Sequence, residues 1–333
     1  MKATIREVAK YAGVSVATVS RYLNNSPLIA DASAEKVKQA IAALNYQPSM
    51  MARGLLHGNS KTVALAVDYS NTETYGNDFF LRIQYGLEHE LTRNGYYLMI
   101  CHVGTGKNEV STLESIINEN RIDGLVLLSE LAQPSVLDLL QNSQLPYVIA
   151  GRSSDPRTVW VDIDNIEAGR SATRYLISTG AESVGFLTNS FDKAFVAERF
   201  AGYKDAMTEA GLPVHQEFIT DCLNSPELIC AYLDSRKHEL CDAYVATDSN
   251  IAFYFLRFLA KKGINVPEEV QVIGFDDSIL AKAADPALTV VNIDVTELGI
   301  TAAKTLLKLL QAAELRPGQQ LLPVSIVERF STK

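Results

Sequence analysis

Apolar residues recur at helical spacing near the start of the chain. The first such stretch presents one apolar face, made of Ile5, Val8, Ala9 and Ala12. Thr4 and Glu7 form a Thr-x-x-Glu capping box, which satisfies free amides at a helix start. Gly13 is suited to end the helix because glycine adopts the left-handed C-cap conformation at little cost. The pattern therefore predicts a short capped helix that ends at Gly13.

Two more helices are predicted after this turn. Ser15 can cap a helix over 16–22 with Val19 facing inward, and Asp31 can cap a third helix. The third helix contributes the apolar residues Val37, Ala40, Ile41 and Leu44. Two short helices joined at a glycine turn, with a third behind them, are typical of a helix-turn-helix unit.

The second helix of such a unit enters the DNA major groove with its N-terminal end. The residues expected to face DNA are Ser15, Val16, Ala17, Thr18, Ser20 and Arg21. Arg21 can form two hydrogen bonds to a guanine edge. The hydroxyl side chains suit phosphate oxygens, and the short apolar ones suit thymine methyl groups. Helix capping by the serines and a solvent-exposed ion pair at Arg21 stay open as alternatives.

From residue 61 short apolar strands alternate with amphipathic helices. Strands are expected at 63–68, 97–102, 124–128, 147–150, 184–188, 243–247 and 270–275. Helices are expected between most of them, such as 80–93 and 250–262. This alternation is typical of a parallel α/β architecture, in which ligands bind beyond the carboxyl ends of the strands. No nucleotide-binding or serine hydrolase motif follows any of these strands, so an enzyme of either class lacks support.

Polar and aromatic residues near strand ends and in one helix are the candidates for a ligand site. They are Phe79, Phe80, Arg152, Lys193, Arg199, Thr247, Asp248 and Asp276. Carboxylate, guanidinium and hydroxyl groups offer many hydrogen bonds and suit a polyhydroxylated ligand. An aromatic face suits the apolar side of a sugar ring or a base, although core packing of the Phe pair is the alternative.

Composition and charge place this architecture in a soluble protein with an asymmetric charge. The chain has 333 residues, of which 47% are hydrophobic and 21% charged, with a formal net charge of −9. Residues 1–60 carry seven basic and three acidic side chains, so a basic head precedes an acidic body. The four cysteines form no CxxC pair, and no apolar signal peptide or membrane span is present. A reducing, cytoplasmic location is expected.

The N-terminal motif closely resembles the signature of the lactose repressor family. The matching segments are TIREVAKYAGVS at 4–15 and ATVSR at 17–21, with 35–37, 44–48 and 52–55 resembling the third helix and hinge. The resemblance implies a short hinge helix over 50–56, with Leu55 inserted as a wedge in the minor groove. Packing of Leu55 against a partner's hinge helix stays open. Thr4, Asn24 and Ala52 complete the expected DNA-binding set.

The body resembles the periplasmic sugar-binding fold that this family carries. The matching segments are 78–80, 95–96, 121–125, 161–165, 198–202 and 273–277. The resemblance implies two lobes that the chain connects three times, near Asp162, Val291 and Leu322. The expected domains are a helix-turn-helix at 1–47, a hinge helix and linker at 48–60, and an effector-binding and dimerisation domain at 61–333. Its first lobe spans about 61–161 with 292–321, and its second about 162–291 with 322–333.

The implied function is repression of a carbohydrate-utilisation operon. The expected partners are a palindromic operator, a second copy of the chain and a sugar or sugar derivative; no cofactor, metal or membrane is expected. Arg199 and Asp276 are the firmest ligand contacts by resemblance, with an ion pair between the lobes as the alternative. Thr247 stands where many relatives have Asn, and Arg152 where some have an acid, so the ligand stays open. A binding protein without a DNA role is the remaining rival, and the basic head argues against it.

Overall fold

The computed structural model describes residues 3–23, 26, 28–46, 59–68, 78–103, 109–221, 223, 225–236, 239–311 and 318–333. The chain divides into two compact units, residues 1–62 with 119–123 and residues 63–118 with 124–333. The predicted hinge helix at 50–56 lies outside the described residues. The expected boundaries of the hinge, at residues 47/48 and 60/61, therefore stay a prediction.

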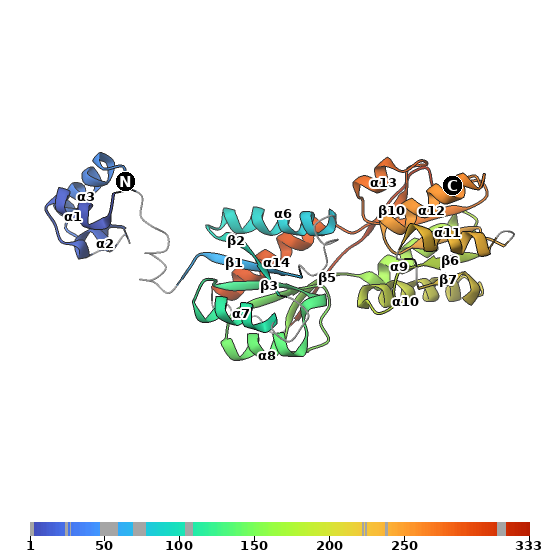
Figure 1. Cartoon of the computed structure of the whole chain (residues 1–333), viewed down its shortest axis with the longest axis horizontal. Coiled ribbons are helices and arrows are strands. Elements are labelled where there is room, and N and C mark those ends of the chain that lie inside the picture. The colour runs from blue at the N-terminus through green and yellow to red at the C-terminus, as the bar shows by residue number, and fades with distance from the viewer. Residues whose placement is uncertain are drawn as a thin grey trace. The chain divides into compact units, whose positions relative to one another are not determined.

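Three helices form the head of the first unit. They are α1 (Ile5–Ala12), α2 (Val16–Leu23) and α3 (Asp31–Ala43), drawn in blue in Figure 1. Both halves of the capping box form: the amide of Thr4 donates to Glu7 Oε2 (2.7 Å), and the amide of Glu7 donates to Thr4 Oγ1 (3.4 Å). Gly13 has a φ of 65°, the left-handed conformation predicted for it. The helices bury a small core of Val8, Ala9, Ala12, Val19, Val37 and Ala40.

The expected cap of the third helix is wrong. Asp31 is the first residue of α3, and Ala30 precedes it without any side-chain cap bond. A carboxylate in the first turn still lies favourably near the positive end of the helix dipole. Elsewhere in this unit the Asp123 carboxylate accepts hydrogen bonds from the amides of Ser60 (2.6 Å) and Lys61 (2.9 Å), which joins the linker to residues 119–123.

The second unit contains a first lobe, built on one of two six-stranded sheets in the described part of the chain. Its sheet has the order β11-β5-β4-β3-β1-β2. The strands are β1 (Thr62–Val67), β2 (Tyr97–His102), β3 (Gly124–Leu128), β4 (Tyr147–Ala150), β5 (Val159–Ile163) and β11 (Gly318–Leu322). The helices are α6 (Asp78–Arg93), α7 (Glu109–Asn118), η1 (Ser129–Leu131), α8 (Pro134–Ser143) and α14 (Val295–Leu310). Nearly all of β1 is buried because helices cover both faces of a parallel sheet.

The second lobe repeats this plan with the strand order β12-β10-β9-β8-β6-β7. The strands are β6 (Val184–Leu187), β7 (Ile219–Thr220), β8 (Ala243–Ala246), β9 (Gln271–Phe275), β10 (Thr289–Asn292) and β12 (Ser325–Val327). The helices are α9 (Asn165–Ser178), α10 (Ala194–Glu209), η2 (Gln216–Phe218), α11 (Pro226–Ser235), α12 (Ser249–Lys261) and α13 (Ile279–Ala283). The strands pair in parallel except β12, which is antiparallel to β10.

The chain passes between the two sheets after β5, after β10 and after β11. The α/β class and two-lobed architecture predicted from the sequence are confirmed. The ends of β8, β9 and β10 lie side by side, because Val291 of β10 pairs with Phe275 of β9 and Val245 of β8 pairs with Ile273. This edge of the second sheet positions most of the candidate ligand residues.

Candidate functional site

The exposed face of α2 carries most of the residues predicted to contact DNA. Ser15, Val16, Ala17 and Arg21 are exposed, and Thr18 and Ser20 are partly exposed. The amide of Thr18 donates to Ser15 Oγ (3.1 Å), so Ser15 caps α2, which was the alternative left open. Capping does not prevent a phosphate contact, because a hydroxyl group has a donor and two lone pairs.

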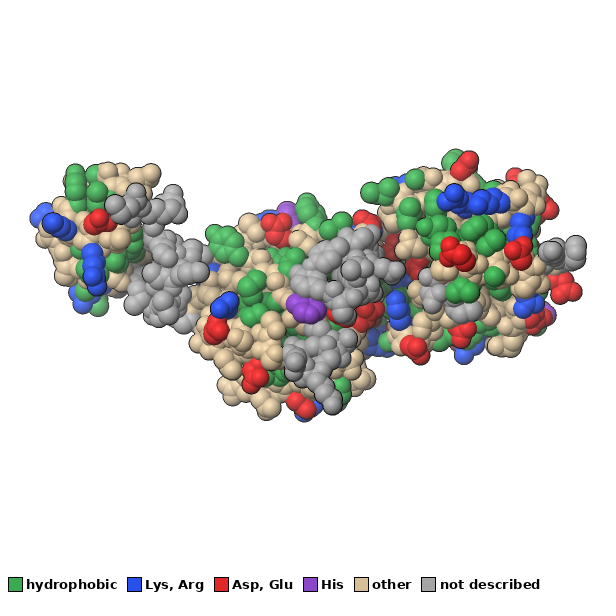
Figure 2. All heavy atoms as spheres, viewed as in Figure 1, with side chains coloured by type: hydrophobic (Ala, Val, Ile, Leu, Met, Phe, Trp, Pro, Cys, Tyr) green, Lys and Arg blue, Asp and Glu red, His purple; other side chains and the backbone are tan. Residues whose placement is uncertain are grey.

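Arg21 extends from the last turn of α2. It forms no ion pair with any described residue, unlike the solvent-exposed pair considered as the alternative. Figure 2 shows more Lys and Arg than Asp and Glu on the visible face of the headpiece. Thr4 is exposed and takes part in the capping box. The other predicted DNA contacts, Asn24, Ala52 and Leu55, lie outside the described residues.

Arg199 of α10 is the buried cation of the second lobe and is only 4% exposed. Its Nε donates to Oδ1 of Asn165 (3.0 Å), and its Nη1 donates to the carbonyl oxygen of Thr247 (2.6 Å). Its guanidinium carbon lies 4.1 Å from the centre of the Phe275 ring. These neutral partners orient the guanidinium without cancelling its charge. The charge is therefore available to a ligand and to the carboxylates nearby.

Two glycines let α9 and α10 approach closely enough to form this arrangement. A Cβ atom on Gly169 would lie 1.9 Å from the carbonyl oxygen of Arg199. A Cβ atom on Gly202 would lie 1.9 Å from the carbonyl oxygen of Ile166. Because no larger residue fits at either position, the crossing brings Asn165, at the start of α9, to the guanidinium.

Asp276 follows β9 with a φ of 71°, a left-handed conformation that few non-glycine residues adopt. Its Oδ1 atom is buried and has no hydrogen-bond partner among the described residues. Burial raises the pKa of Asp276 to about 6, although the charge of Arg199 opposes the shift. Asp277 differs, because Lys282 (3.0 Å) and Arg329 form ion pairs with it. Of these two neighbouring acids, Asp276 therefore keeps an unsatisfied carboxylate oxygen, which is costly without a ligand.

Three more carboxylates act on Arg199: Asp162, Glu198 and Asp248. Burial raises the pKa of each, and the positive charge of Arg199 opposes the shift. Asp162 Oδ1 accepts a hydrogen bond from the next backbone amide (2.7 Å). Asp248 Oδ1 accepts one from an amide in the first turn of α12 (2.9 Å), so this predicted ligand residue also caps a helix.

Arg152, which follows β4 in the first lobe, contacts Glu198 on α10 of the second lobe. Its Nε lies 2.7 Å from Glu198 Oε1, and this N–H makes no directed hydrogen bond, so the contact is an ion pair. The guanidinium also lies 5.3 Å from the centre of the Trp160 ring. An ion pair between the lobes was the alternative to ligand contact for Arg199 and Asp276. Neither side chain forms an ion pair with a described residue. Arg152 and Glu198 form one instead.

Several buried oxygens near Arg199 have no hydrogen-bond partner among the described residues. They are Glu198 Oε2, Thr247 Oγ1, Asp276 Oδ1 and Asn292 Oδ1. Thr247 and Asp276 follow adjacent strands, and Asn292 ends the next strand of the same sheet. Buried polar atoms are normally paired, so a group of unpaired ones marks a place for a ligand or water. We call these four residues with Arg199 and Arg152 the Arg199 cluster.

Sequence reasoning missed several residues of this region. Three of them lie within the segments that resemble the family but were not predicted as ligand residues: Glu198, Asp162 and Asn165. Asn292 ends β10, a strand that the sequence analysis did not predict. The polar end of the short apolar run 289–292 is the signal that would have found it.

The remaining predicted ligand residues lie around the cluster in different environments. Phe80 is 2% exposed within the core of the first lobe, and Phe79 packs against that core while remaining partly exposed. Core packing, the alternative for this pair, therefore describes the position of Phe80. Lys193 is exposed just before α10, with its Nζ 5.7 Å from the centre of the Phe195 ring.

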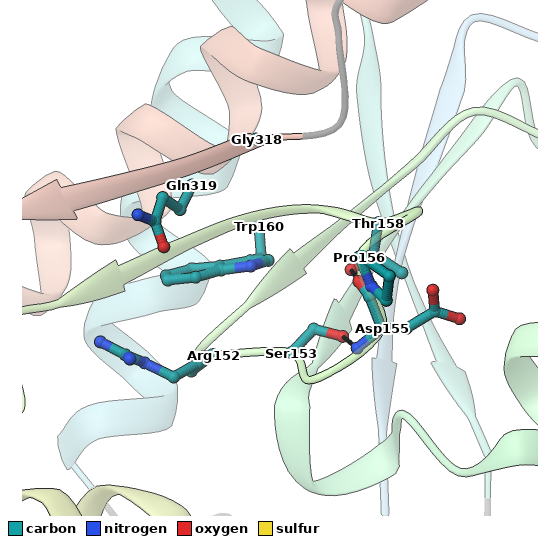
Figure 3. A pocket seen from close by; sticks show the side chains of 8 residues that line it. All are labelled: Arg152, Ser153, Asp155, Pro156, Thr158, Trp160, Gly318 and Gln319. Carbon is teal, nitrogen blue, oxygen red and sulfur yellow. Dashed lines mark hydrogen bonds between the residues drawn. The ribbon is translucent and has the colours of Figure 1, made fainter.

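A pocket of about 440 Å³ lies on the first lobe and shares Arg152 with the Arg199 cluster. It is lined by Arg152, Ser153, Asp155, Pro156, Thr158, Trp160, Gly318 and Gln319 (Figure 3). Two of its polar residues are paired within the protein: Thr158 Oγ1 donates to the Asp155 carbonyl oxygen (2.7 Å), and Arg157, which does not line the pocket, holds the Asp155 carboxylate. The Arg199 cluster, with its unpaired oxygens, is the stronger candidate for a ligand site.

Other kinds of site find no support in the described part of the chain. No group of three His, Cys, Asp or Glu side chains there could hold a metal ion. No helix there is long and apolar enough to cross a membrane. The thiols of Cys101, Cys230 and Cys241 are free, and burial raises the pKa of Cys101 to about 11, which makes a nucleophilic role unfavourable.

Comparison with known families agrees with this geometry. Residues 4–49 match the model of bacterial regulatory proteins of the lacI family. Residues 173–332 match the model of the periplasmic binding protein-like domain. The chain belongs to the lacI family of bacterial regulatory proteins and is a transcriptional regulator. The resemblance stated from the sequence is confirmed.

Individual relatives span nearly the whole chain. The HTH-type transcriptional repressor PurR of Vibrio parahaemolyticus is 32% identical over 94% of this chain and 93% of its own length. The HTH-type transcriptional regulator CelR of Thermobifida fusca is 31% identical over 98% of each. These are regulators and not enzymes, which decides against the enzyme alternative.

Solved structures give the same fold. A transcriptional regulator CelR–cellobiose complex matches with a TM-score of 0.74 and 30% identity, over 99% of this chain and all of the other. The Lac repressor dimer bound to operator and the anti-inducer ONPF matches with a TM-score of 0.83 and 22% identity, over 100% and 99%. At 22% identity, the similarity to the Lac repressor shows a shared fold and no more.

Proposed function

We propose that this protein represses a carbohydrate-utilisation operon and that a sugar bound at the Arg199 cluster controls its affinity for the operator. The observation that carries the proposal is the group of buried, unpaired oxygens around a buried arginine at the end of the second sheet. A polyhydroxylated ligand would satisfy such atoms, since each hydroxyl group can donate one hydrogen bond and accept two. The CelR structure, which is a complex with cellobiose, supports a sugar as the ligand.

The ligand residues in this proposal are Arg199, Asp276, Thr247 and Asn292, with Arg152 and Glu198 at the junction of the lobes. Phe79, Lys193 and Asp248 are secondary candidates for ligand contact in this proposal. The buried position of Phe80 favours a role in the core of the first lobe. Two lobes joined by three chain segments can rotate relative to one another, and a ligand that bridges them would bias that rotation.

On the DNA side, α2 is proposed to enter the major groove, with Arg21 reading a base and Ser15, Thr18 and Ser20 contacting phosphates. Residues 48–60 would form the hinge, with Leu55 as a minor-groove wedge. A homodimer on a palindromic operator, in the cytoplasm, is the proposed assembly. The Lac repressor structure, a dimer bound to operator, supports this assembly.

A thermal-shift screen of neutral sugars, including cellobiose, tests the ligand. Fluorescence anisotropy on DNA from the protein's own promoter region then tests the coupling. We expect a sugar that raises the melting temperature to change operator affinity as well. Failure of every sugar to bind, or a bound sugar without effect on DNA affinity, would contradict the proposal.

A further inference from the structure

The unpaired oxygens of the Arg199 cluster can all accept hydrogen bonds, and its one unpaired donor among the described residues, Arg152 Nε, faces Glu198 Oε1. Glu198 Oε2, Asp276 Oδ1 and Asn292 Oδ1 are acceptors, and Thr247 Oγ1 can accept as well as donate. A ligand that satisfies them must bring donor hydrogens. Phosphate dianions and carboxylates have few or no donors, so they cannot supply these hydrogen bonds.

The charges around the cluster disfavour a further anion. Asp162, Glu198, Asp248 and Asp276 all act on Arg199, and burial raises the pKa of all four despite its positive charge. Negative charge is therefore already costly at this place in the ligand-free protein. An anionic ligand would add to that cost, since it would lie in the same poorly solvated surroundings.

Arg152 is the guanidinium that would otherwise suit a phosphate group. Its ion pair with Glu198 (2.7 Å) and its position over the Trp160 ring occupy it within the protein. Arg199 in turn is bound to Asn165 and to the Thr247 carbonyl oxygen. The Nε of each arginine faces a protein group, so neither offers the side-on fork that includes Nε for bidentate binding of phosphate.

We infer that the Arg199 cluster selects an uncharged, hydroxyl-rich carbohydrate and rejects sugar phosphates and sugar acids. This inference rests on the proposed carbohydrate effector and narrows it by charge. Glu198 and Asp276 determine this specificity, because they supply both the unpaired acceptors and the negative charge.

Inorganic phosphate tests the charge preference without knowledge of the effector. The chain has a single tryptophan, and this Trp160 lies beside Arg152, so its fluorescence reports binding at Arg152. Glu198→Gln with Asp276→Asn removes two negative charges and frees Arg152. We expect wild type to show no saturable response up to the highest phosphate concentration used, and the double variant to saturate with a Kd at least about tenfold below that concentration.

A matched control removes the same number of charges outside the cluster, from α10, the helix that carries Glu198. Asp205→Asn with Glu209→Gln frees Arg170 and Arg174, which these acids bind on the exposed side of α9 and α10. We expect no Trp160 response to phosphate in this variant. Saturable phosphate binding by wild type, or an equal response in both double variants, would overturn the inference.

Matched sugars test the same preference with carbohydrate. Calorimetry on the full-length protein compares glucose with glucose 6-phosphate, galactose with galacturonate, and cellobiose with cellobionate. We expect each ligand that binds to be the neutral member of its pair, and tighter binding of a charged member would overturn the inference. If no sugar of either kind binds, the carbohydrate effector is contradicted, and the phosphate experiment still decides the charge preference.

Discussion

Arg152 Nε lies 2.7 Å from Oε1 of Glu198, and this ion pair joins the first lobe to the second. The Arg152 side chain is one-third exposed, and that of Glu198 is 16% exposed. The Arg152 guanidinium also packs against the Trp160 ring, and Figure 3 shows the side chains of Arg152 and Trp160 facing each other. This ion pair is a direct charged contact between the lobes. It would couple their relative position to the proposed ligand site.

A double-mutant cycle measures this contact. Arg152→Gln leaves Glu198 as an unpaired, half-buried charge, and we expect it to lower the free energy of unfolding by about 1–2 kcal/mol. Glu198→Gln alone should cost less, because Arg152 remains partly solvated. The double variant should recover about 1 kcal/mol relative to the sum. Urea denaturation followed by circular dichroism provides the values, and strict additivity would show that the pair contributes nothing.

Stability should depend on pH through Asp276. Burial raises its pKa from 3.8 to about 6, so the folded state holds a proton that the unfolded state has lost in this range. The protonated form therefore stabilises the fold at low pH, and that stability falls as pH rises through about 6. Asp276→Asn keeps the shape, and asparagine tolerates the left-handed backbone. At about pH 8 we expect the variant to be more stable than wild type by about 1–2 kcal/mol, with no difference near pH 4.

The neighbouring acid is the control for this experiment. Burial alone would raise the pKa of Asp277, but hydrogen bonds from Lys282 and Arg329 outweigh it and hold the pKa below its usual range. Asp277→Asn should therefore destabilise the protein at about pH 8, the opposite sign. Thermal melts across pH compare the two variants, and effects of the same sign would refute the assignment of Asp276 as the unsatisfied carboxylate.

The close crossing of α9 and α10 is expected to be intolerant of a methyl group. Gly202→Ala places a Cβ atom 1.9 Å from a backbone oxygen of α9, so the helices must separate. We expect a loss of about 1–3 kcal/mol from strain, even though alanine is the better helix former. Ala197→Gly on the exposed side of α10 is the control and should cost about 1 kcal/mol. Calorimetric melts of both variants compare the costs; a neutral Gly202→Ala would mean that the crossing does not depend on this contact.

Arg21→Ala should relax base preference in the operator. The motivating observation is an exposed guanidinium on α2 without an ion pair among the described residues. Loss of a bidentate contact should cost about 1–3 kcal/mol on the preferred base and little on the others. Binding across operator variants measures this, with Lys36→Ala on α3 as a charge-matched control. An equal loss on every sequence would assign Arg21 to a phosphate.

The sequence predicted the architecture well where burial produced continuous apolar runs, as in β1 and β3. It missed β11, whose sequence GQQLL is largely exposed at a sheet edge, and it also missed β5 and β10, which are short and buried. Arg199 and Asp276 were found because the family motif and a strand end mark them. The partnership of Arg152 with Glu198 depends on how two lobes meet, which no local pattern encodes. The position of Phe80 in the core likewise depends on tertiary packing, which no local pattern encodes.

The central claim is that a ligand at the Arg199 cluster controls operator binding, and one measurement tests it directly. Operator affinity of wild type and Asp276→Asn is measured by anisotropy with and without the sugar found by thermal shift. We predict equal affinities without sugar, a change of about tenfold or more on adding sugar to wild type, and no change in the variant. An Asp276→Asn protein that responds to the sugar like wild type would contradict the account.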